Sequence, residues 1–394
     1  MSRKVGIIGV GQTKHGRRDD VNYIDLVYDA VRAAMEDVKI SPGDIDAVVS
    51  GSMPPPMEGI NAPHLYWSDA MGAFGKPSMR IATCGSTGMS IAQSAYYHVA
   101  SGLFDVVLAV GAEKMLENDP QGTMTTVADP FFQRPFIAGA PGVFSMQSIQ
   151  YSHRYGLPEE RVRMAAAQIS VDHHTNALDN PYAHIRIKIT VDDVLKSRII
   201  SYPTRLLDVC PSSDGACALV FACEEKAKKI AESPDEIAWV KGVGYAGDEH
   251  FFGDSDKVVW ESAIKASQEA YKMAGIQNPL KDLDVAEIYN PFTYQELIYY
   301  ECFGFCGKGE ACKLVEDGAV LRGGELPCDP SGGTLCTNPI GATGLLRVGE
   351  AALQVSGRAD KRQVPGARTA LSHAMGGSDQ FNGIMILGSD KMEV

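Results

Sequence analysis

The chain is built from two halves that repeat the same order of strand-like and helix-like segments. Thr87-Gly88 and Thr343-Gly344 each open a helix-like stretch that ends in Ser-Gly. This alternation predicts two α/β halves, each with a mostly parallel sheet covered by helices. Glycine-rich turns recur in all such folds, so a chance likeness between two unrelated halves is the alternative. The other matching segments are 5–11 with 237–244, 23–35 with 263–273, and 45–49 with 283–288.

The two halves differ in length. Between the strands expected at 105–110 and 216–222, the first half carries about a hundred extra residues, which is far longer than an ordinary connection. Insertions on a rigid scaffold commonly carry binding loops, so we expect this one to contact substrate, with a decorative or oligomerisation insertion as the alternative. The expected division is a first half at 1–112 and 208–235, an inserted loop domain at 113–207, and a second half at 236–394.

Cys84 is the most informative single residue. It lies in Ile81-Ala-Thr-Cys-Gly-Ser-Thr-Gly-Met89, directly before the amphipathic run 90–103. At the start of a helix, free backbone N–H groups and the positive end of the helix dipole favour the thiolate, which is the nucleophilic form of cysteine. This position predicts covalent acyl transfer, and a buried structural cysteine is the alternative.

The composition argues against several other classes of protein. The net charge of −13 and the lack of a basic block argue against nucleic acid and anionic membranes as partners. The chain opens Met1-Ser-Arg-Lys and goes straight into a strand-like run, with no secretory segment and no apolar stretch of membrane-spanning length. We therefore expect a cytoplasmic protein whose nine cysteines are free thiols.

Several ordered motifs resemble the thiolase superfamily. They are most similar to its sterol-carrier type and to the thiolases that work with a small zinc-ribbon/OB-fold subunit. The resemblance implies the thiolase fold, an α/β fold of two duplicated βαβαβαββ halves in five αβαβα layers with an inserted loop domain. Besides the context of Cys84, the motifs are Ser212-Ser-Asp-Gly-Ala216, Gly304-Phe-Cys-Gly-Lys-Gly-Glu310, Ser331-Gly-Gly333, Asn338-Pro-Ile-Gly-Ala-Thr-Gly344 and Gly376-Gly377.

The resemblance also implies a function and partners. A thiolase cleaves or forms a 3-oxoacyl-CoA with coenzyme A as co-substrate, through an acylated cysteine, here Cys84. No cofactor is expected to be bound covalently, and any zinc is expected in the small partner. The implied assembly is a homodimer with one small subunit on each protomer, a heterotetramer. The substrate and CoA contacts that follow from the resemblance are Gly341, Gly344, Gly376, Gly377 and Tyr294.

Two motifs depart from the family at catalytic positions. The usual Gly-His-Pro reads Thr337-Asn338-Pro339. Asn is a poor base, so we assign Asn338 to oxyanion stabilisation, with a helix cap as the alternative. Where the family commonly has Asn-Glu-Ala-Phe or His-Asp-Cys-Phe, the chain has Tyr289-Asn-Pro-Phe292. We expect Tyr289 to contact a thioester oxygen or hold a water, with Asn290 at the next position, unless Tyr289 packs in the core.

The third departure lies in Ser372-His-Ala-Met-Gly-Gly377, where many thiolases carry a second cysteine that acts as acid and base. Ala374 takes that position, and His373 precedes it. An imidazole titrates in the working pH range, so His373 is the best remaining proton shuttle, with a hydrogen-bonded structural histidine as the alternative. Proton transfer must then come from His373, Tyr289 or water.

Two clusters of cysteine and histidine residues give only weak indications of a metal site. Cys302, Cys306 and Cys312 lie close together but fit no common zinc spacing well. His173-His174 is expected to be a solvated or loop pair rather than a ligand site. We therefore expect no metal site in this chain.

Three functions fit these residues. The first is a thiolase-type acyl-CoA C-acyltransferase. The second is an aldolase or lyase of the same fold that works through Tyr289 without acylating a cysteine, and the third is a non-catalytic acyl-CoA-binding subunit. Tyr294, Tyr299 and Tyr300 could accommodate a ring. With a resemblance to the catalytic subunits of benzoylsuccinyl-CoA thiolases, these rings suggest (S)-2-benzoylsuccinyl-CoA of anaerobic toluene degradation, cleaved to benzoyl-CoA and succinyl-CoA. Acetoacetyl-CoA is the alternative substrate.

Overall fold

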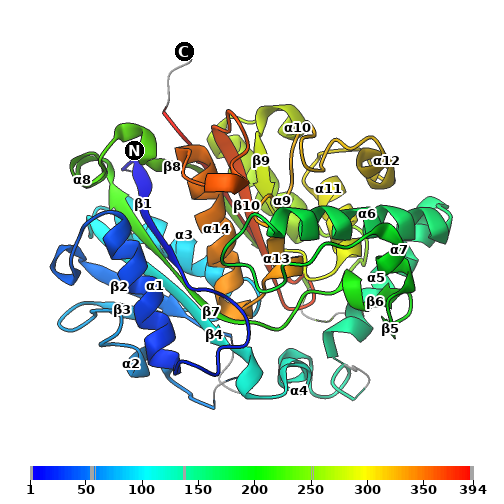
Figure 1. Cartoon of the computed structure of the whole chain (residues 1–394), viewed down its shortest axis with the longest axis horizontal. Coiled ribbons are helices and arrows are strands. Elements are labelled where there is room, and N and C mark those ends of the chain that lie inside the picture. Colours follow the sequence, from blue (N-terminus) through cyan, green and yellow to red (C-terminus); the bar gives the residue numbers. More distant parts are fainter. Residues whose placement is uncertain are drawn as a thin grey trace.

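The computed structural model describes residues 3–53, 57, 59–135, 139–249, 251 and 253–390. Within these ranges the centre of the molecule is a mixed sheet in the order β3-β2-β4-β7-β1-β8-β11-β10-β9 (Figure 1), and β5 pairs with β6 outside it. The strands are β1 (Val5–Gln12), β2 (Ala47–Gly51), β3 (Ser78–Arg80), β4 (Val106–Lys114), β5 (Ile199–Ser201), β6 (Thr204–Arg205), β7 (Asp214–Cys223), β8 (Ala238–Gly247), β9 (Val285–Glu287), β10 (Thr369–Gly376) and β11 (Phe381–Gly388).

The helices follow the sequence pattern closely. The helix α1 begins after Asn22, whose side chain accepts a hydrogen bond from the N–H of Asp25. The helix α14 is buried on nearly every side, as its apolar sequence requires of an interior helix. No helix in the described ranges combines the length and the apolar run that a bilayer crossing needs. The α-helices are α1 (Tyr23–Asp37), α2 (Pro63–Tyr66), α3 (Thr87–Ala100), α4 (Pro120–Met124), α5 (Gly139–Tyr155), α6 (Glu159–Ala177), α7 (Val191–Lys196), α8 (Glu224–Ile230), α9 (Glu261–Ala274), α10 (Pro279–Asp282), α11 (Thr293–Cys302), α12 (Ala311–Glu316), α13 (Gly333–Cys336) and α14 (Ile340–Ser356).

The strand order confirms the internal duplication. The first half runs β2-β4-β7-β1 and the second runs in reverse as β8-β11-β10-β9, so that β1 and β8 meet in the middle. Equivalent pairs have equivalent directions: β2/β4 and β9/β10 are parallel, whereas β4/β7 and β10/β11 are antiparallel. The expectation of mostly parallel sheets is wrong, because β7 and β11 are each antiparallel to both of their neighbours.

Helices and strands form five layers, as expected. The helix α1 covers the outer side of the first half of the sheet, and α9 covers the outer side of the second half. Between the two halves, α3 and α14 pack against each other and against strands of both (Figure 1). The start of α3 and the start of α14 therefore both lie in the middle of the molecule.

The matched Thr-Gly pairs lie where these two central helices cross. A Cβ atom added at Gly88 would come within 2.2 Å of the backbone nitrogen of Leu345, and one at Gly344 within 2.6 Å of that of Met89. Only glycine allows two backbones to approach so closely. The repeated Thr-Gly pair of the sequence thus allows α3 and α14 to pack closely at the centre of the fold.

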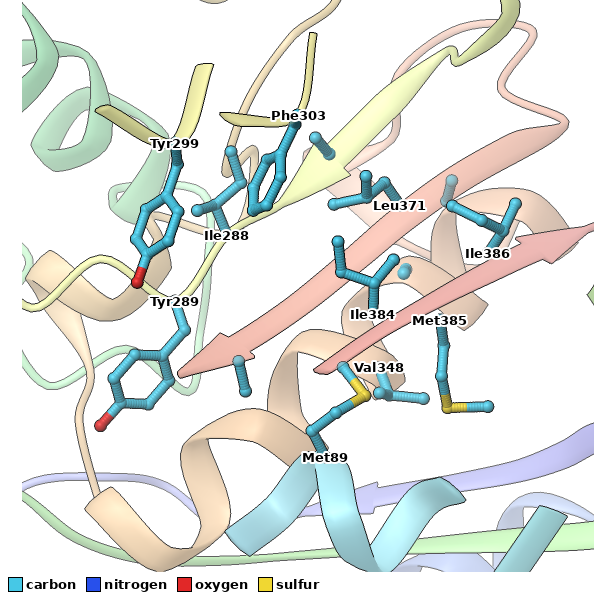
Figure 2. Packing of buried hydrophobic residues seen from close by; sticks show 14 of the residues in the cluster. Met89, Ile288, Tyr289, Tyr299, Phe303, Val348, Leu371, Ile384, Met385 and Ile386 are labelled. Atoms are coloured by element: carbon cyan, nitrogen blue, oxygen red, sulfur yellow. The ribbon is translucent and has the colours of Figure 1, made fainter. Parts of the chain in front are cut away.

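Apolar residues of α3, α14 and the strands β9 to β11 form the core of the second half (Figure 2). Met89 comes from α3, Val348 from α14, and Leu371 and Ile384 from neighbouring strands. Tyr289 lies at the edge of this cluster and directs its hydroxyl away from it (Figure 2). One face of the cluster thus supports a polar site.

The segment expected as an insertion forms α4 to α7 and the β5/β6 hairpin. Its helices α5 and α6 pack against α11, and α6 also contacts α12 and α13 (Figure 1). The expectation that His173-His174 is a solvated pair is wrong, because α6 continues to Ala177 and both imidazoles are buried beneath it. The exact boundaries of the three units stay a prediction.

Candidate active site

A cavity of about 110 Å³ lies beside the first turn of α3. Its walls come from several parts of the chain: Met53 after β2, the turn that carries Cys84, the insertion, the loop before β7, the segment after β9, and the loops that precede α14 and follow β10. A cavity of this volume has room for a group of several non-hydrogen atoms. It brings Cys84, Tyr289, Asn338 and Gly377 together, as the sequence predicts.

Cys84 has a strained backbone. Its φ angle is +54°, in the left-handed region that residues other than glycine seldom adopt. Two hydrogen bonds hold the surrounding turn, residues 83–86. The N–H of Thr83 donates to the hydroxyl of Thr87 (2.9 Å), and the N–H of Thr87 donates to the carbonyl of Cys84 (3.0 Å). Strain that is held in this way is typical of functional positions.

The environment of the Cys84 thiol differs in one respect from the prediction. The thiol stands before α3, but burial raises its pKa above the ordinary value, and a hydrogen bond from the backbone N–H of Gly377 only partly opposes this. Gly377 has a φ of +71°, a conformation that suits glycine. The start of the helix is therefore not enough to keep this thiol ionised at neutral pH.

Asn338 is buried, and both the oxygen and the nitrogen of its side-chain amide form hydrogen bonds. Its Oδ1 accepts from the hydroxyls of Tyr289 (3.3 Å) and Thr343 (2.8 Å). Its Nδ2 therefore faces the other way and donates to the sulfur of Cys210 at 3.1 Å. All of these partners are side chains, one of them that of Thr343 in the first turn of α14, and no side-chain cap on the backbone N–H groups of that helix is formed.

Tyr289 reaches the cavity, whereas Asn290 does not. Burial is the main reason why the pKa of Tyr289 lies well above its ordinary value, so its hydroxyl stays protonated. That hydroxyl lies close to the Cys84 turn, since a Cβ atom added at Gly85 would be 3.0 Å from it. Asn290 is fully buried and donates to Glu296. Successive side chains of an extended segment point to opposite sides, which separates the two.

His373 lies outside the cavity, contrary to expectation. It is fully buried on β10, its Nε2 pairs with Oδ1 of Asn382 at 2.9 Å, and the rings of Tyr299 and Phe303 pack against it at 4.4 and 4.9 Å. Burial lowers its pKa to about 3. Along β10 the wall of the cavity begins at Met375, so the structure gives His373 the environment of a neutral structural histidine.

Of the four glycines expected to contact substrate or CoA, Gly377 lines the cavity. The others pack against neighbouring groups. The N–H of Gly341 donates to Glu113 at 3.0 Å, and Gly344 lies at the crossing of α3 and α14. A Cβ atom at Gly376 would lie 2.3 Å from the backbone of the Cys84 turn. These three glycines shape the site from behind its walls.

The three tyrosines expected to accommodate a ring do not line this cavity. Tyr294 borders a smaller one between α5, α6 and α11. The hydroxyl of Tyr299 donates to Asp379 at 2.8 Å, and that of Tyr300 donates to Glu296. Both rings are buried. Tyrosines on α11 are therefore part of the packing behind the site.

The residue that the sequence analysis missed is Cys210. It is half-buried, lines the cavity and accepts the hydrogen bond from Asn338. Cys210 stands two residues before the Ser212-Ser-Asp-Gly-Ala216 motif, and that position was the available signal. Its side chain reaches the site because the loop before β7 pairs with the segment after β9.

The fold is a duplicated α/β fold, and a cysteine at a left-handed turn faces its central cavity. Together they are typical of enzymes that use a covalent cysteine nucleophile. The chain belongs to the thiolase superfamily. A family model described as Thiolase, N-terminal domain, matches residues 5–139, and one described as Thiolase C-terminal domain-like matches residues 244–389. The predicted fold class is confirmed.

Similar proteins include several of sterol-carrier or thiolase type. An acetyl-CoA acetyltransferase of Methanothermobacter thermautotrophicus is 33% identical over 95% of this chain and 97% of its own length. The benzoylsuccinyl-CoA thiolase subunit BbsB of Thauera aromatica is 32% identical over 96% of both chains. Among solved structures, the Ltp2-ChsH2(DUF35) aldolase superposes with a TM-score of 0.83 at 25% identity, covering 100% of this chain and 99% of the other.

Proposed function

We propose that this chain is an acyl-CoA C-acyltransferase of the thiolase type, which passes an acyl group through Cys84. The observation that carries the proposal is the Cys84 thiol, presented to the cavity by a left-handed turn with the N–H of Gly377 directed at its sulfur. A nucleophile held on a strained turn in a cavity is typical of covalent catalysis. The similarity to an acetyl-CoA acetyltransferase supports the same chemistry.

In this proposal the Cys84 thiolate attacks the 3-oxo carbon of a 3-oxoacyl-CoA. The bond to the adjacent carbon then breaks, which leaves an acyl-enzyme and the carbanion of a shorter acyl-CoA. After that carbanion is protonated and its acyl-CoA leaves, a second CoA thiolate takes the acyl group from Cys84. The donors available for the oxyanions are the N–H of Gly377 and the second N–H of the Asn338 amide, whereas the hydroxyl of Tyr289 would first have to leave Oδ1 of Asn338.

An aldolase is the second candidate. One observation favours it: the hydroxyl of Tyr289 stays protonated at the cavity and lies next to the Cys84 turn, where it could donate to a carbonyl without any acyl-enzyme. The similar Ltp2-ChsH2(DUF35) structure is described as an aldolase. The presence of Cys84 in the same cavity favours the acyltransferase.

The walls of the cavity favour an uncharged acyl group. They include Met115, Met124, Val143, Phe144 and Phe292, and no Lys, Arg or His occurs among the lining residues that the structure describes. A carboxylate buried without a cation is costly. The benzoyl part of (S)-2-benzoylsuccinyl-CoA suits such walls and the similarity to BbsB supports it, but its free carboxylate would lack a partner. Acetoacetyl-CoA or another uncharged 3-oxoacyl-CoA meets no such cost.

A homodimer with a small zinc-ribbon/OB-fold subunit on each protomer remains part of the proposal. The similar BbsB is described as a subunit, and the similar aldolase structure pairs Ltp2 with ChsH2(DUF35). Phe131 and Phe132 of the insertion are 79% and 67% exposed directly beside Gln133, which lines the cavity. Exposed aromatic side chains of this kind are common at protein interfaces.

Single-turnover assays with intact mass spectrometry test the proposal. The full chain is mixed with acetoacetyl-CoA, longer 3-oxoacyl-CoAs or (S)-2-benzoylsuccinyl-CoA and quenched before free CoA is added. An acyltransferase gains the mass of one acyl group on Cys84 and loses it when CoA follows. Cleavage of a 3-hydroxyacyl-CoA without any added mass would instead support the aldolase. Binding of CoA esters with neither reaction would identify a non-catalytic subunit.

A further inference from the structure

The proposed reaction needs a group that protonates a carbanion and later takes a proton from CoA. Among the lining residues that the structure describes, the titratable side chains are Cys84, Cys210 and Tyr289. Cys84 carries the acyl group during these steps, so its sulfur has no free valence for a proton. The proton must therefore pass through Cys210, Tyr289 or a water.

Backbone contacts hold Cys210 at the cavity. Val209 forms an antiparallel bridge with Phe292, and the N–H of Cys210 donates to the carbonyl of Pro291 at 2.9 Å. These contacts tie the loop before β7 to the segment that carries Tyr289. Main-chain pairing thus sets the backbone position of Cys210 beside the cavity.

The hydrogen bonds around Asn338 distinguish Cys210 from Tyr289. The hydroxyl of Tyr289 donates its proton to Oδ1 of Asn338, which also accepts from Thr343. The amide of Asn338 can then only donate to Cys210, whose sulfur accepts at 3.1 Å. The proton of Tyr289 is therefore engaged, whereas the S–H proton of Cys210 is not used in that hydrogen bond.

We infer that Cys210 is the acid and base of this site, which protonates the carbanion and takes the proton of the incoming CoA. The inference rests on the proposed function. The cycle starts after the Cys84 thiol has released its proton to bulk water, with Cys84 as thiolate and Cys210 as thiol. As the carbon–carbon bond breaks, the electron pair left on the carbanion takes the proton of Cys210, and its sulfur becomes a thiolate. That thiolate takes the proton of the CoA thiol, the CoA sulfur attacks the acyl carbon, and Cys84 leaves as thiolate. No proton is gained or lost over the cycle.

The protonation of Cys210 agrees with this role. Burial raises its pKa to about 12, against a smaller opposing effect of the Asn338 hydrogen bond. The group is therefore a thiol at neutral pH and holds the proton that the carbanion needs. Once it has given that proton, the Asn338 amide stabilises the thiolate that remains.

Hydrogen–deuterium exchange tests the inference apart from acyl transfer. In the reverse direction, the base removes a proton from the carbon beside the thioester, so the α-protons of acetyl-CoA, propionyl-CoA and succinyl-CoA should exchange with deuterated water. We expect exchange in the wild-type chain, slower exchange in Cys84→Ala, where no acylation of Cys84 generates the Cys210 thiolate, and a loss of about a hundredfold or more in Cys210→Ser. Serine can still accept the Asn338 hydrogen bond, so a purely structural role of Cys210 would leave exchange in this variant unchanged.

Steady-state thiolysis completes the test. Cys210→Ser should lower kcat by about a hundredfold or more while KM changes little. Cys306→Ser, a half-buried cysteine outside the cavity, is the matched control. Exchange and kcat at wild-type level in Cys210→Ser would overturn the inference. A wild-type chain that shows neither exchange nor thiolysis with any of these esters would contradict the proposed function itself.

Discussion

Two buried polar regions lie side by side at the end of β9, and their chemistry is opposite. Glu287 on β9 belongs to an ion network in which Arg347 pairs with Glu287 and Asp329, and His173 lies 3.3 Å from Glu296 and 3.8 Å from Asp329. Two residues further along the chain, Tyr289 enters the cavity, where the other polar groups are thiols, amides and hydroxyls. One region is charged and closed, and the other is uncharged and accessible.

The difference shows how this chain separates stability from reactivity. Each member of the ion network is at most 3% exposed at its side chain, and such charges hold their segments in place because a missing partner is costly. The network joins α6, β9, α11 and α14. The cavity itself contains no fixed charge on its described walls, and burial raises the pKa of both of its thiols, Cys84 and Cys210.

The largest expected effect is on the uncharged side of this comparison. Cys84→Ala should lower thiolysis by several orders of magnitude, because the variant loses the covalent route through Cys84. The free energy of unfolding should change little, since Cys84 is not part of the ion network. Parallel kinetics and denaturant titration check both statements, with Cys306→Ser as the control. Retention of a tenth of the wild-type rate would remove Cys84 from the mechanism.

Arg347→Met should produce the converse result. It leaves Glu287 without its buried cation and Asp329 with His173 alone, and breaking a buried pair typically costs about 3–5 kcal/mol of stability. Arg358→Met is the matched control, because Arg358 pairs with Asp37 at 2.9 Å near the surface, where loss of a pair costs about 1 kcal/mol or less. Denaturant titration of the two variants gives the comparison. Equal losses would mean that the ion network contributes no more than a surface pair.

Asn338→Ala should have an intermediate effect that is confined to catalysis. Loss of one oxyanion donor commonly costs about a hundredfold in turnover, so kcat should fall while KM stays nearly constant. Thr343→Val, which removes only the hydroxyl that orients Asn338, should cost less. A raised KM with unchanged kcat would show that Asn338 binds substrate and does not stabilise the transition state.

The smallest effect is a pH dependence of stability that differs between two buried histidines. Burial alone would lower the pKa of His173, but Glu296 and then Asp329 outweigh it and raise the pKa from 6.5 to about 9. Its contribution to stability is thus complete below pH 6.5 and is lost as the pH rises through 9. The pKa of His373 is lowered to about 3, so its contribution is complete above pH 6.5 and is lost as the pH falls toward 3.

Denaturant titrations from pH 4 to 10 separate the two histidines. His173→Gln should flatten the loss of stability on the alkaline side, and His373→Gln should reduce the loss on the acid side. The ligand atoms of His173, Glu296 and Asp329 lie within 4.8 Å of one another, as metal ligands would. A protonated imidazole cannot bind a metal. If His173→Gln left the loss of stability at alkaline pH unchanged, the imidazole of His173 would not be protonated in the folded chain, as it would not be with a bound metal.

Local patterns predicted most of the fold and the position of the candidate nucleophile at the cavity. Cys84 could be identified because its turn and α3 are contiguous in sequence, and the duplicated strands because glycine turns mark their ends. The direction of β7 and β11 could not be predicted, since it depends on which strands they pair with. Tertiary contacts also decide the positions of His373 and Cys210. His373 was expected at the site but is covered by residues of and next to α11. Cys210 was missed because only the pairing of Val209 with Phe292 brings it to the cavity.

The crossing of α3 and α14 at Gly88 and Gly344 also bears on the ancestry of the site. Each copy of the repeat contributes the loop before its central helix: one loop carries Cys84 and the other carries Asn338. In each copy the threonine beside the glycine secures that loop, Thr87 through the N–H of Thr83 and Thr343 through the side chain of Asn338. The two copies of the repeat thus contribute different residues to one site. Neither copy could be deleted or exchanged for the other without removing one side of the cavity.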